Sequence, residues 1–259
     1  MRASEIVAIL LWSACALAQP PAEDAALSAL LEKSAAHGRL FAAEFPAYTC
    51  NERVLQVKYG QGNHVDAKQE EMYDYLILIH GEAGGLTFEE SRIRRQGPEK
   101  PPQRPLLATT GFAVLSVIFH EEFQSSYQFR RLGPEALGGR MTEKVAFEAV
   151  PGRPSPSVLE VGGRQYSLEW RGTAWLDPAS GAVVRIEAAL AGTLDDIGLV
   201  GLRAEVDYAA VEGAQALWLP RQAIVEARTL RQRWRNVHAF SGFRRFEVQT
   251  EQKIGEVRQ

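Results

Sequence analysis

Hydrophobic positions along this chain change their spacing once, from a helical repeat to a strict alternation. In residues 22–45, leucines recur three and four positions apart, Asp24 lies near the start, and Pro46 follows the end. This spacing is typical of an amphipathic helix, and proline cannot continue one. From Tyr48 onward apolar and polar residues alternate, as they do along strands with one buried face. The pattern predicts one leading helix followed by a mainly β (α+β) domain.

The alternation is clearest in the second half of the chain, in residues 165–170, 184–190, 202–208 and 245–249. Clusters of glycine, proline and acidic residues separate these runs and indicate tight turns. The turn signals lie at residues 81–85, 138–139, 162–163, 177–181 and 212–213. We expect about ten antiparallel strands, with neighbours joined as hairpins.

The turn at residues 177–181 raises the question of whether Asp177 takes part in chemistry. Pro178 presets a turn dihedral, an aspartate can bond its own backbone, and Gly181 can adopt the left-handed conformation. No histidine, cysteine or second acid stands near Asp177 in the sequence. We therefore expect Asp177 to turn the chain rather than to act in catalysis.

One segment departs from the alternation, because residues 111–120, "GFAVLSVIFH", are apolar on every side. A segment without a polar stripe must be buried or covered. We expect a central helix that lies, with the leading helix, on the concave face of a curved sheet. Periodicity alone fits a buried strand nearly as well.

The first residues have the pattern of a secretory signal peptide. Residues 6–18 form a short apolar run that ends in a small-x-small signature, which predicts cleavage after Ala18 and a periplasmic or secreted protein. The run is too short for a membrane span of about 20 residues, and we expect no transmembrane span elsewhere. Residues 1–18 are thus the predicted signal peptide and residues 19–259 a single domain. Anchoring through an acylated Cys15 is the weaker alternative, because Trp12 fits a lipoprotein signal poorly.

Composition and motifs argue against several classes of function. The net charge is -3, and cleavage would leave Cys50 as the one cysteine, a buried apolar residue without a disulfide. We find no nucleophile elbow, zinc helix, phosphate-binding glycine loop or paired-cysteine site, so we predict no catalytic residue, no cofactor and no metal. The cluster His120-Glu121-Glu122 is more simply a solvated end of the apolar segment than a metal site.

Basic residues gather late in the chain, in "RTLRQRWRNVHAFSGFRR". In a strand, Arg231, Arg233 and Arg235 would share one face and Trp234 would point the other way. A solvated face is the simpler interpretation, and an anionic partner, such as a lipid headgroup or an acidic protein, is the functional one. An exported protein is not expected to meet nucleic acid.

Three features together resemble the LolA/LolB-like outer-membrane lipoprotein-sorting superfamily. They are "WLDPASGAVVRIE" at residues 175–187, "VDYAAVEGAQALWLP" at residues 206–220, and the signal peptide followed by a helix. The ending "RNVHAFSGFRRFEV" is similar to a group of uncharacterised secreted bacterial proteins. The resemblance implies a single strongly curved antiparallel sheet, an open half-barrel, with helices on its concave face and an apolar cavity that takes acyl chains.

The sequence therefore favours an exported, non-catalytic, monomeric protein that binds a lipid, a lipidated protein or another apolar ligand. The alternative is a cell-envelope module that binds or senses a protein and whose own side chains fill the cavity. An enzyme is the least favoured hypothesis. Each candidate for lining the cavity is a large apolar side chain for which core packing, taken singly, is the simpler role. These candidates are Phe112, Leu115, Ile118, Phe119, Trp170, Trp175 and Trp218.

Overall fold

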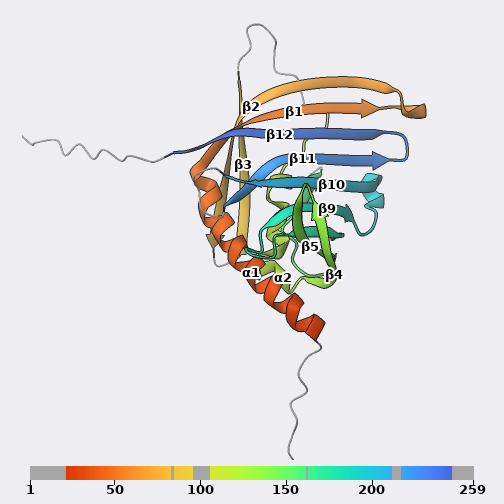
Figure 1. Cartoon of the computed structure of the whole chain (residues 1–259). Coiled ribbons are helices and arrows are strands. Elements are labelled where there is room, and N and C mark those ends of the chain that lie inside the picture. The colour runs from red at the N-terminus through yellow and green to blue at the C-terminus, as the bar shows by residue number, and fades with distance from the viewer. Residues whose placement is uncertain (1–21, 83–84, 96–105, 162, 212–216, 247–259) are drawn as a thin grey trace, which may run out of the picture.

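The computed structural model of the protein describes residues 22–82, 85–95, 106–161, 163–211 and 217–246 (Figure 1). Most of these residues form strands. The helical elements are α1 (Ala22–Glu44), η1 (Phe45–Ala47), η2 (Gln61–Asn63), η3 (Phe112–Phe119), α2 (Glu121–Gln124) and η4 (Asp195–Ile197), where η marks a 3-10 helix. The strands are β1 (Tyr48–Tyr59), β2 (Val65–Glu82), β3 (Gly85–Arg94), β4 (Tyr127–Leu137), β5 (Arg140–Ala149), β6 (Val158–Val161), β7 (Arg164–Ser167), β8 (Trp170–Leu176), β9 (Val183–Leu190), β10 (Leu199–Ala210), β11 (Trp218–Thr229) and β12 (Arg233–Arg245).

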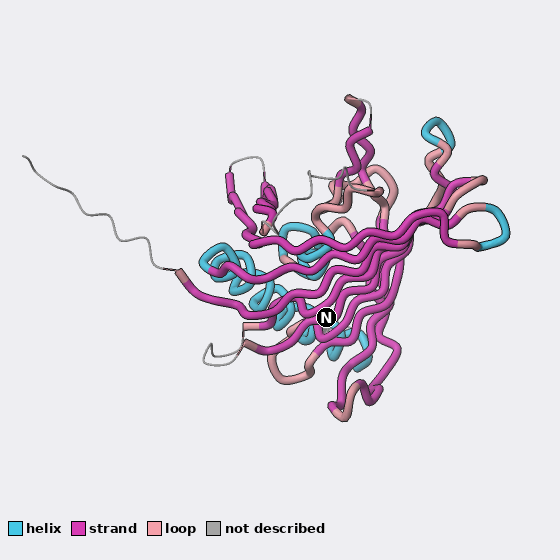
Figure 2. Tube along the Cα trace, turned by 90° about the horizontal axis from the view of Figure 1, so that it is seen from above, coloured by secondary structure: helices cyan, strands magenta, loops and turns pink. Residues whose placement is uncertain are grey.

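Ten of these strands form one antiparallel sheet in the order β3-β2-β1-β12-β11-β10-β9-β8-β5-β4. Within the described chain the sheet is open, with β3 and β4 at its edges, and β6 and β7 form a separate hairpin. Almost every neighbouring pair is consecutive in the sequence, whereas β1 pairs with β12 and so joins the two ends of the domain. Figure 2 shows the twist of the strands from above. The prediction of a mainly β protein with a large antiparallel sheet is confirmed.

The alternation of the sequence accounts for which side chains the sheet buries. In β10 the predicted apolar face is buried, with Val206 fully inaccessible, while Arg203 and the acids beside it point outward. One predicted strand needs correction. Residues 165–170 are not one strand, because β7 ends at Ser167 and β8 begins at Trp170. The strand predicted at residues 245–249 and the turn at 212–213 lie largely outside the described residues.

The leading helix is present as α1 and crosses one side of the sheet obliquely in Figure 1. At Gly38 it passes so close to the chain before α2 that an added Cβ would lie 3.1 Å from the Cα of His120. Near its middle, Lys33 donates from Nζ to the carbonyl of Pro178 over 2.8 Å. Gly181 has a φ of 73° there, and a Cβ on it would lie 2.4 Å from the backbone of Lys33. Two glycines thus allow α1 to pack closely.

The apolar segment is helical, and the buried-strand alternative is wrong. Residues Phe112–Phe119 form a 3-10 helix in which every residue from Ala113 onward is buried. It contacts α1 and strands β9, β10 and β11. The Tyr208 hydroxyl accepts the N–H of Ser116 over 3.0 Å and bonds the carbonyl of Ala113 over 3.3 Å. The segment therefore fills the interior between α1 and the sheet.

Asp177 turns the chain as the sequence predicts. Its Oδ1 accepts the backbone N–H groups of Ala179 and Ser180 over 3.0 and 2.9 Å, and its Oδ2 accepts from Arg140 over 3.0 Å. Partial burial tends to raise the pKa of Asp177, but the hydrogen bonds from Ser180, Arg140 and Ala179 outweigh it and lower the pKa. These bonds hold the hairpin against which α1 packs.

Candidate functional site

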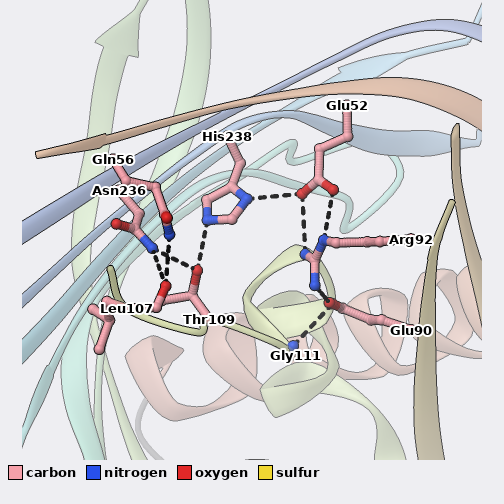
Figure 3. A network of polar contacts seen from close by, with 9 residues as sticks. All are labelled: Glu52, Gln56, Glu90, Arg92, Leu107, Thr109, Gly111, Asn236 and His238. Carbon is pink, nitrogen blue, oxygen red and sulfur yellow. Dashed lines mark hydrogen bonds and ion pairs between the residues drawn. The ribbon is translucent and has the colours of Figure 1, made fainter. Parts of the chain in front are cut away.

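Buried polar side chains gather on the inward face of β1 and β12 (Figure 3). Glu52 and Gln56 lie on β1, and Asn236 and His238 lie opposite on β12, where Gln56 pairs with Asn236. All four are nearly inaccessible to solvent. On β1, Glu52 and Gln56 point to the same face as the buried Val54. The charged Glu52 thus lies at a position where the alternation predicts an apolar residue. A charge is seldom fully buried unless it is paired.

The charge of Glu52 is balanced by Arg92 from β3. Arg92 donates from Nε to Oε2 of Glu52 over 2.6 Å and from Nη2 to Oε1 over 3.0 Å. Its Nη1 lies 2.8 Å from Oε2 of Glu90, and its guanidinium lies over the ring of Tyr75. Burial alone would raise the pKa of Glu52, but hydrogen bonds from His238 and Arg92 outweigh burial and lower it. The carboxylate is therefore stabilised in its charged form.

The network also holds residues 106–111, which we call the tethered segment, against the sheet. Gln56 donates to the carbonyl of Leu107 over 2.6 Å, and Asn236 donates to the same carbonyl over 2.9 Å. Glu90 accepts the N–H of Gly111 over 2.8 Å. Because η3 begins at the next residue, these bonds fix the point at which the buried helix enters the interior.

Thr109, His238 and Glu52 form a chain of hydrogen bonds inside this network. Oγ1 of Thr109 lies 2.8 Å from Nε2 of His238, and Nδ1 of His238 lies 2.7 Å from Oε1 of Glu52. A hydroxyl, an imidazole and a carboxylate in this order can activate a nucleophile. Here, however, Asn236 also donates to Oγ1 over 3.0 Å, Arg92 shares the carboxylate, and Thr109 is only 7% exposed. We interpret the chain as part of the tether.

A hollow of about 120 Å³ lies beside the network. Its wall is polar at Arg92 and His238 and apolar at Val54 and Leu107. It thus lies between the tethered segment and the inward face of the sheet, at the junction of the polar network and apolar surface.

Six of the seven predicted lining residues belong to or pack against one apolar core. Leu115, Ile118 and Phe119 of η3 are buried there, with Phe112 packed against them. Trp170 and Trp218 join the same core from the sheet. Whether any of the six contacts a ligand stays a prediction.

Trp175 does not lie in the core with the other six predicted lining residues. Its Nε1 donates to Glu135 over 3.0 Å, and Lys144 and Arg185 lie 5.0 and 6.0 Å from its ring. Because Trp170 points into the core from the same strand, a residue five positions away points to the opposite face. Trp175 therefore packs among charged side chains on the outward side.

The predicted basic face is only partly assembled. Arg231 lies in the turn before β12, whereas Arg233 and Arg235 lie on the strand with one residue between them. Arg233 stacks over the ring of Tyr59 at 4.2 Å, and Arg235 lies 3.6 Å from Glu226. An anionic partner for these arginines stays a prediction.

Cys50 and His120, two other groups that could carry chemistry, have structural roles. Cys50 is buried, and burial, followed by the nearby charge of Glu52, raises its pKa to about 12. His120 accepts the N–H of Glu122 and caps α2. Among the described residues, no group of three or more histidine, cysteine or acidic side chains is placed to hold a metal ion. Over the same residues, no helix has the length and apolar character needed to cross a membrane.

The network itself was not identified from the sequence, although half of it carries a signal. Glu52 and Gln56 stand at the buried parity of "TCNERVLQVKY", as do Asn236 and His238 in "RWRNVHAFSGFRR". Polar residues at buried positions of two strands indicate a shared polar site. Arg92 and the tethered segment carry no such signal, because only the fold brings them to β1 and β12.

Fold and site together define a mainly β protein with an open antiparallel sheet, a buried helical segment and a buried ion network. No family model matches the chain, and no curated protein matches it. Solved structures of similar fold include a LolA superfamily protein from Nitrosomonas europaea, with 13% identity, coverage of 86% of this chain and 94% of that one, and a TM-score of 0.36.

A DUF1329 family protein from Desulfovibrio piger has 14% identity, coverage of 90% and 95%, and a TM-score of 0.43. A domain named as an outer membrane lipoprotein-sorting protein from Vibrio parahaemolyticus has 12% identity, coverage of 85% and 95%, and a TM-score of 0.40. With identities of 12–14% and TM-scores of 0.36–0.43, these likenesses decide neither the family nor the function of the chain, and function is argued below from the chain's own residues.

Proposed function

We propose that the chain is an exported, non-catalytic protein that binds a lipid, a lipidated protein or another apolar ligand between its sheet and its helices. In this proposal the sheet is a curved half-barrel, and α1 and η3 are a cover over its concave face. The observation that supports it is the complete burial of residues Ala113–Phe119 against β9, β10 and β11. A helix, rather than a second sheet, shields this apolar surface.

The character of η3 suits it to displacement by a ligand. Its hydrogen bonds are of the 3-10 type, whose geometry is poor and which seldom extends beyond about four residues. The Tyr208 hydroxyl bonds two backbone groups of η3. The side chains of η3 are almost all apolar, and their hydrophobic contacts are non-directional. An acyl chain can replace such contacts at about 0.8 kcal/mol per buried CH₂.

The tethered segment gives this movement a fixed end. Its bonds to Gln56, Asn236 and Glu90 hold the chain before η3 on the sheet. Gly111, at the start of η3, has a φ of 79°, and an added Cβ would meet no atom within 4 Å. Glycine adopts this region without strain, so we expect η3 to swing about Gly111 while the tether stays in place.

A reversible disulfide tests the proposed movement. A Cβ built on Gly38 would lie 3.3 Å from the Cβ of His120, close to the spacing of about 3.5–4.5 Å in a disulfide. The double variant Gly38→Cys/His120→Cys, when oxidised, would hold the end of η3 to α1. We expect a dansylated fatty acid to bind the reduced form and the native protein, with binding weakened at least tenfold by oxidation. The single variant Gly38→Cys serves as the control that cannot form this bond.

Two outcomes would contradict the proposal. If the native protein takes up neither the dansylated fatty acid nor phospholipid, the apolar-ligand function is wrong. If the oxidised double variant binds as tightly as the reduced one, the ligand does not enter by displacing η3.

One observation favours a second candidate function, a cell-envelope module that binds or senses a protein. The same burial of η3 means that the interior is already filled by the chain's own side chains. Such a module would use an outward surface, including Arg233 and Arg235, to meet an acidic partner. Its purified form would carry no lipid, which separates the two candidates.

The proposal includes export and processing. Cleavage after Ala18 would release residues 19–259 as one monomeric domain. In the alternative, a lipoprotein anchored through Cys15, the mature protein would keep Cys15 and have a different N-terminus. N-terminal sequencing of the protein from the periplasmic fraction distinguishes these ends. Light scattering of the same material tests for the monomer.

A further inference from the structure

The outward face of the sheet carries a hollow of about 400 Å³ over β8 to β12, opposite the apolar core. Half of the twelve residues that line it are charged, and they lie on strands rather than in loops. Those used below are Arg171, Glu187, Ala189, Arg203 and Glu205.

Cross-strand pairing arranges the arginines in one row. Arg171 pairs with Ala189, and Ala189 pairs with Arg203, so a single small side chain separates the two arginines. Two strand spacings put their Cα atoms about 10 Å apart, within reach of a shared ligand. In the described part of the chain neither Arg171 nor Arg203 has an ion-pair partner, although Glu226 pairs with Arg203 in register.

The next row is acidic. Glu187 pairs directly with Glu205 across β9 and β10, an arrangement in which like charges repel. Arg185 contacts both carboxylates and also lies 3.7 Å from Asp207, so one guanidinium serves three acids. The hollow thus has an excess of positive charge along one row and of negative charge along the row beside it. The two rows are two residues apart along each strand, a distance of about 7 Å between Cα atoms.

We propose that this hollow binds an aminoalkyl phosphate, a group of the phosphoethanolamine type. The phosphate oxygens would lie between Arg171 and Arg203, whose planar guanidinium groups suit phosphate. The ammonium, which has three donors, would lie against Glu187 and Glu205. A simple anion would meet the acidic row and a simple cation the arginines, so the pattern favours a zwitterion. The site lies on the other face of the sheet from the proposed acyl site and does not depend on it.

The proposal predicts a selectivity among soluble headgroups. In ¹⁵N NMR titrations of the full mature chain, glycerophosphoethanolamine should shift amides of β8, β9 and β10. Glycerophosphocholine, whose ammonium has no N–H, and glycerophosphoglycerol, which has no ammonium, should bind at least tenfold more weakly. Each charge-assisted hydrogen bond to phosphate contributes about a tenfold factor or more in affinity.

Variants separate the site from general charge effects. Arg171→Gln and Arg203→Gln should each weaken binding of glycerophosphoethanolamine about tenfold, and Ala189→Leu should block the hollow without changing its charge. Arg228→Gln removes an exposed arginine of β11 that does not line the hollow, and it should bind as the native protein does. Thermal melting of every variant checks that the sheet is intact.

Vesicles identify the source of the group. Binding to phosphatidylethanolamine vesicles that Arg203→Gln weakens about tenfold assigns the site to a lipid headgroup. Binding of the soluble group alone assigns it to a free metabolite. The proposal is overturned if neither form binds, if glycerophosphoglycerol binds equally well, or if Ala189→Leu and Arg203→Gln bind as the native protein does.

Discussion

Replacing Glu52 with glutamine tests the buried network most directly. Glutamine preserves the size of the side chain and one carbonyl oxygen, but it removes the charge that faces Arg92. Glu52 has a fully buried side chain, so water cannot replace the lost interaction. We expect the folded state of Glu52→Gln to lose both stability and part of its dependence on pH.

The magnitude follows from the contacts. Three hydrogen bonds to a charged group are affected, at 2.6 and 3.0 Å from Arg92 and at 2.7 Å from His238. Breaking a buried ion pair costs about 3–5 kcal/mol. Arg92 retains Glu90 as a partner at 2.8 Å, which places the expected loss near the lower end, about 3 kcal/mol.

The pH dependence gives the test a sign. Because the folded-state pKa of Glu52 is lowered from 4.5, its contribution is fully present above pH 4.5 and is lost as the pH falls through the lowered pKa. The difference in unfolding free energy between the native protein and Glu52→Gln should therefore be largest near neutral pH and shrink in acid. Urea unfolding at several pH values measures it.

A matched control lies nearby, where Glu70 of β2 pairs with Arg53 of β1. Glu70 accepts two bonds from Arg53 over 2.6 and 2.8 Å, but this pair is exposed. Glu70→Gln should leave the urea midpoint nearly unchanged, because water screens an exposed pair. The reasoning is refuted if both variants behave alike, or if the effect of Glu52→Gln is below about 1 kcal/mol and independent of pH.

Three further predictions concern packing and reactivity. Gly181→Ala, strained at a φ of 73° and in collision with α1, should destabilise the protein by about 2 kcal/mol or more and open α1 to proteolysis, whereas Gly138→Ala, at a φ of 58° with nothing near, should affect only its own hairpin. Intact α1 in Gly181→Ala would contradict this. Tyr208→Phe leaves the N–H of Ser116 without its partner and should cost about 1–3 kcal/mol in urea unfolding; no loss would mean that another group takes over. Cys50, with a pKa of about 12, should resist alkylation by iodoacetamide at pH 8 until the protein unfolds, and rapid native labelling would contradict its burial.

Local patterns were enough to predict the elements that depend on neighbours in the sequence. Helical spacing predicts α1, alternation predicts the faces of β10, and Asp-Pro with Gly181 predicts the turn. The uniform apolarity of η3 predicts burial but leaves helix and strand undecided, because periodicity is lost when every position is apolar. Its backbone bonds the Tyr208 hydroxyl of β10, a partner that only the fold brings near.

The candidate site depends on pairings that the sequence does not display. Glu52 and His238 meet because β1 pairs with β12. Arg92 reaches them from two strands away, because it lies opposite Tyr75 of β2, and Tyr75 lies opposite Cys50 of β1. Parity alone, by contrast, separates Trp170 from Trp175, since five positions along a strand reverse the direction of a side chain. Parity arguments are therefore reliable within one strand, and contacts between distant strands require the fold.

Native mass spectrometry of the mature protein purified from its own cell envelope tests the central claim, that an apolar ligand lies beneath a movable helical cover. The account predicts protein ions that carry an additional mass in the range of one lipid, and loss of that mass after extraction with organic solvent. Ions of bare protein, both from the envelope and after incubation with phospholipid, would contradict it.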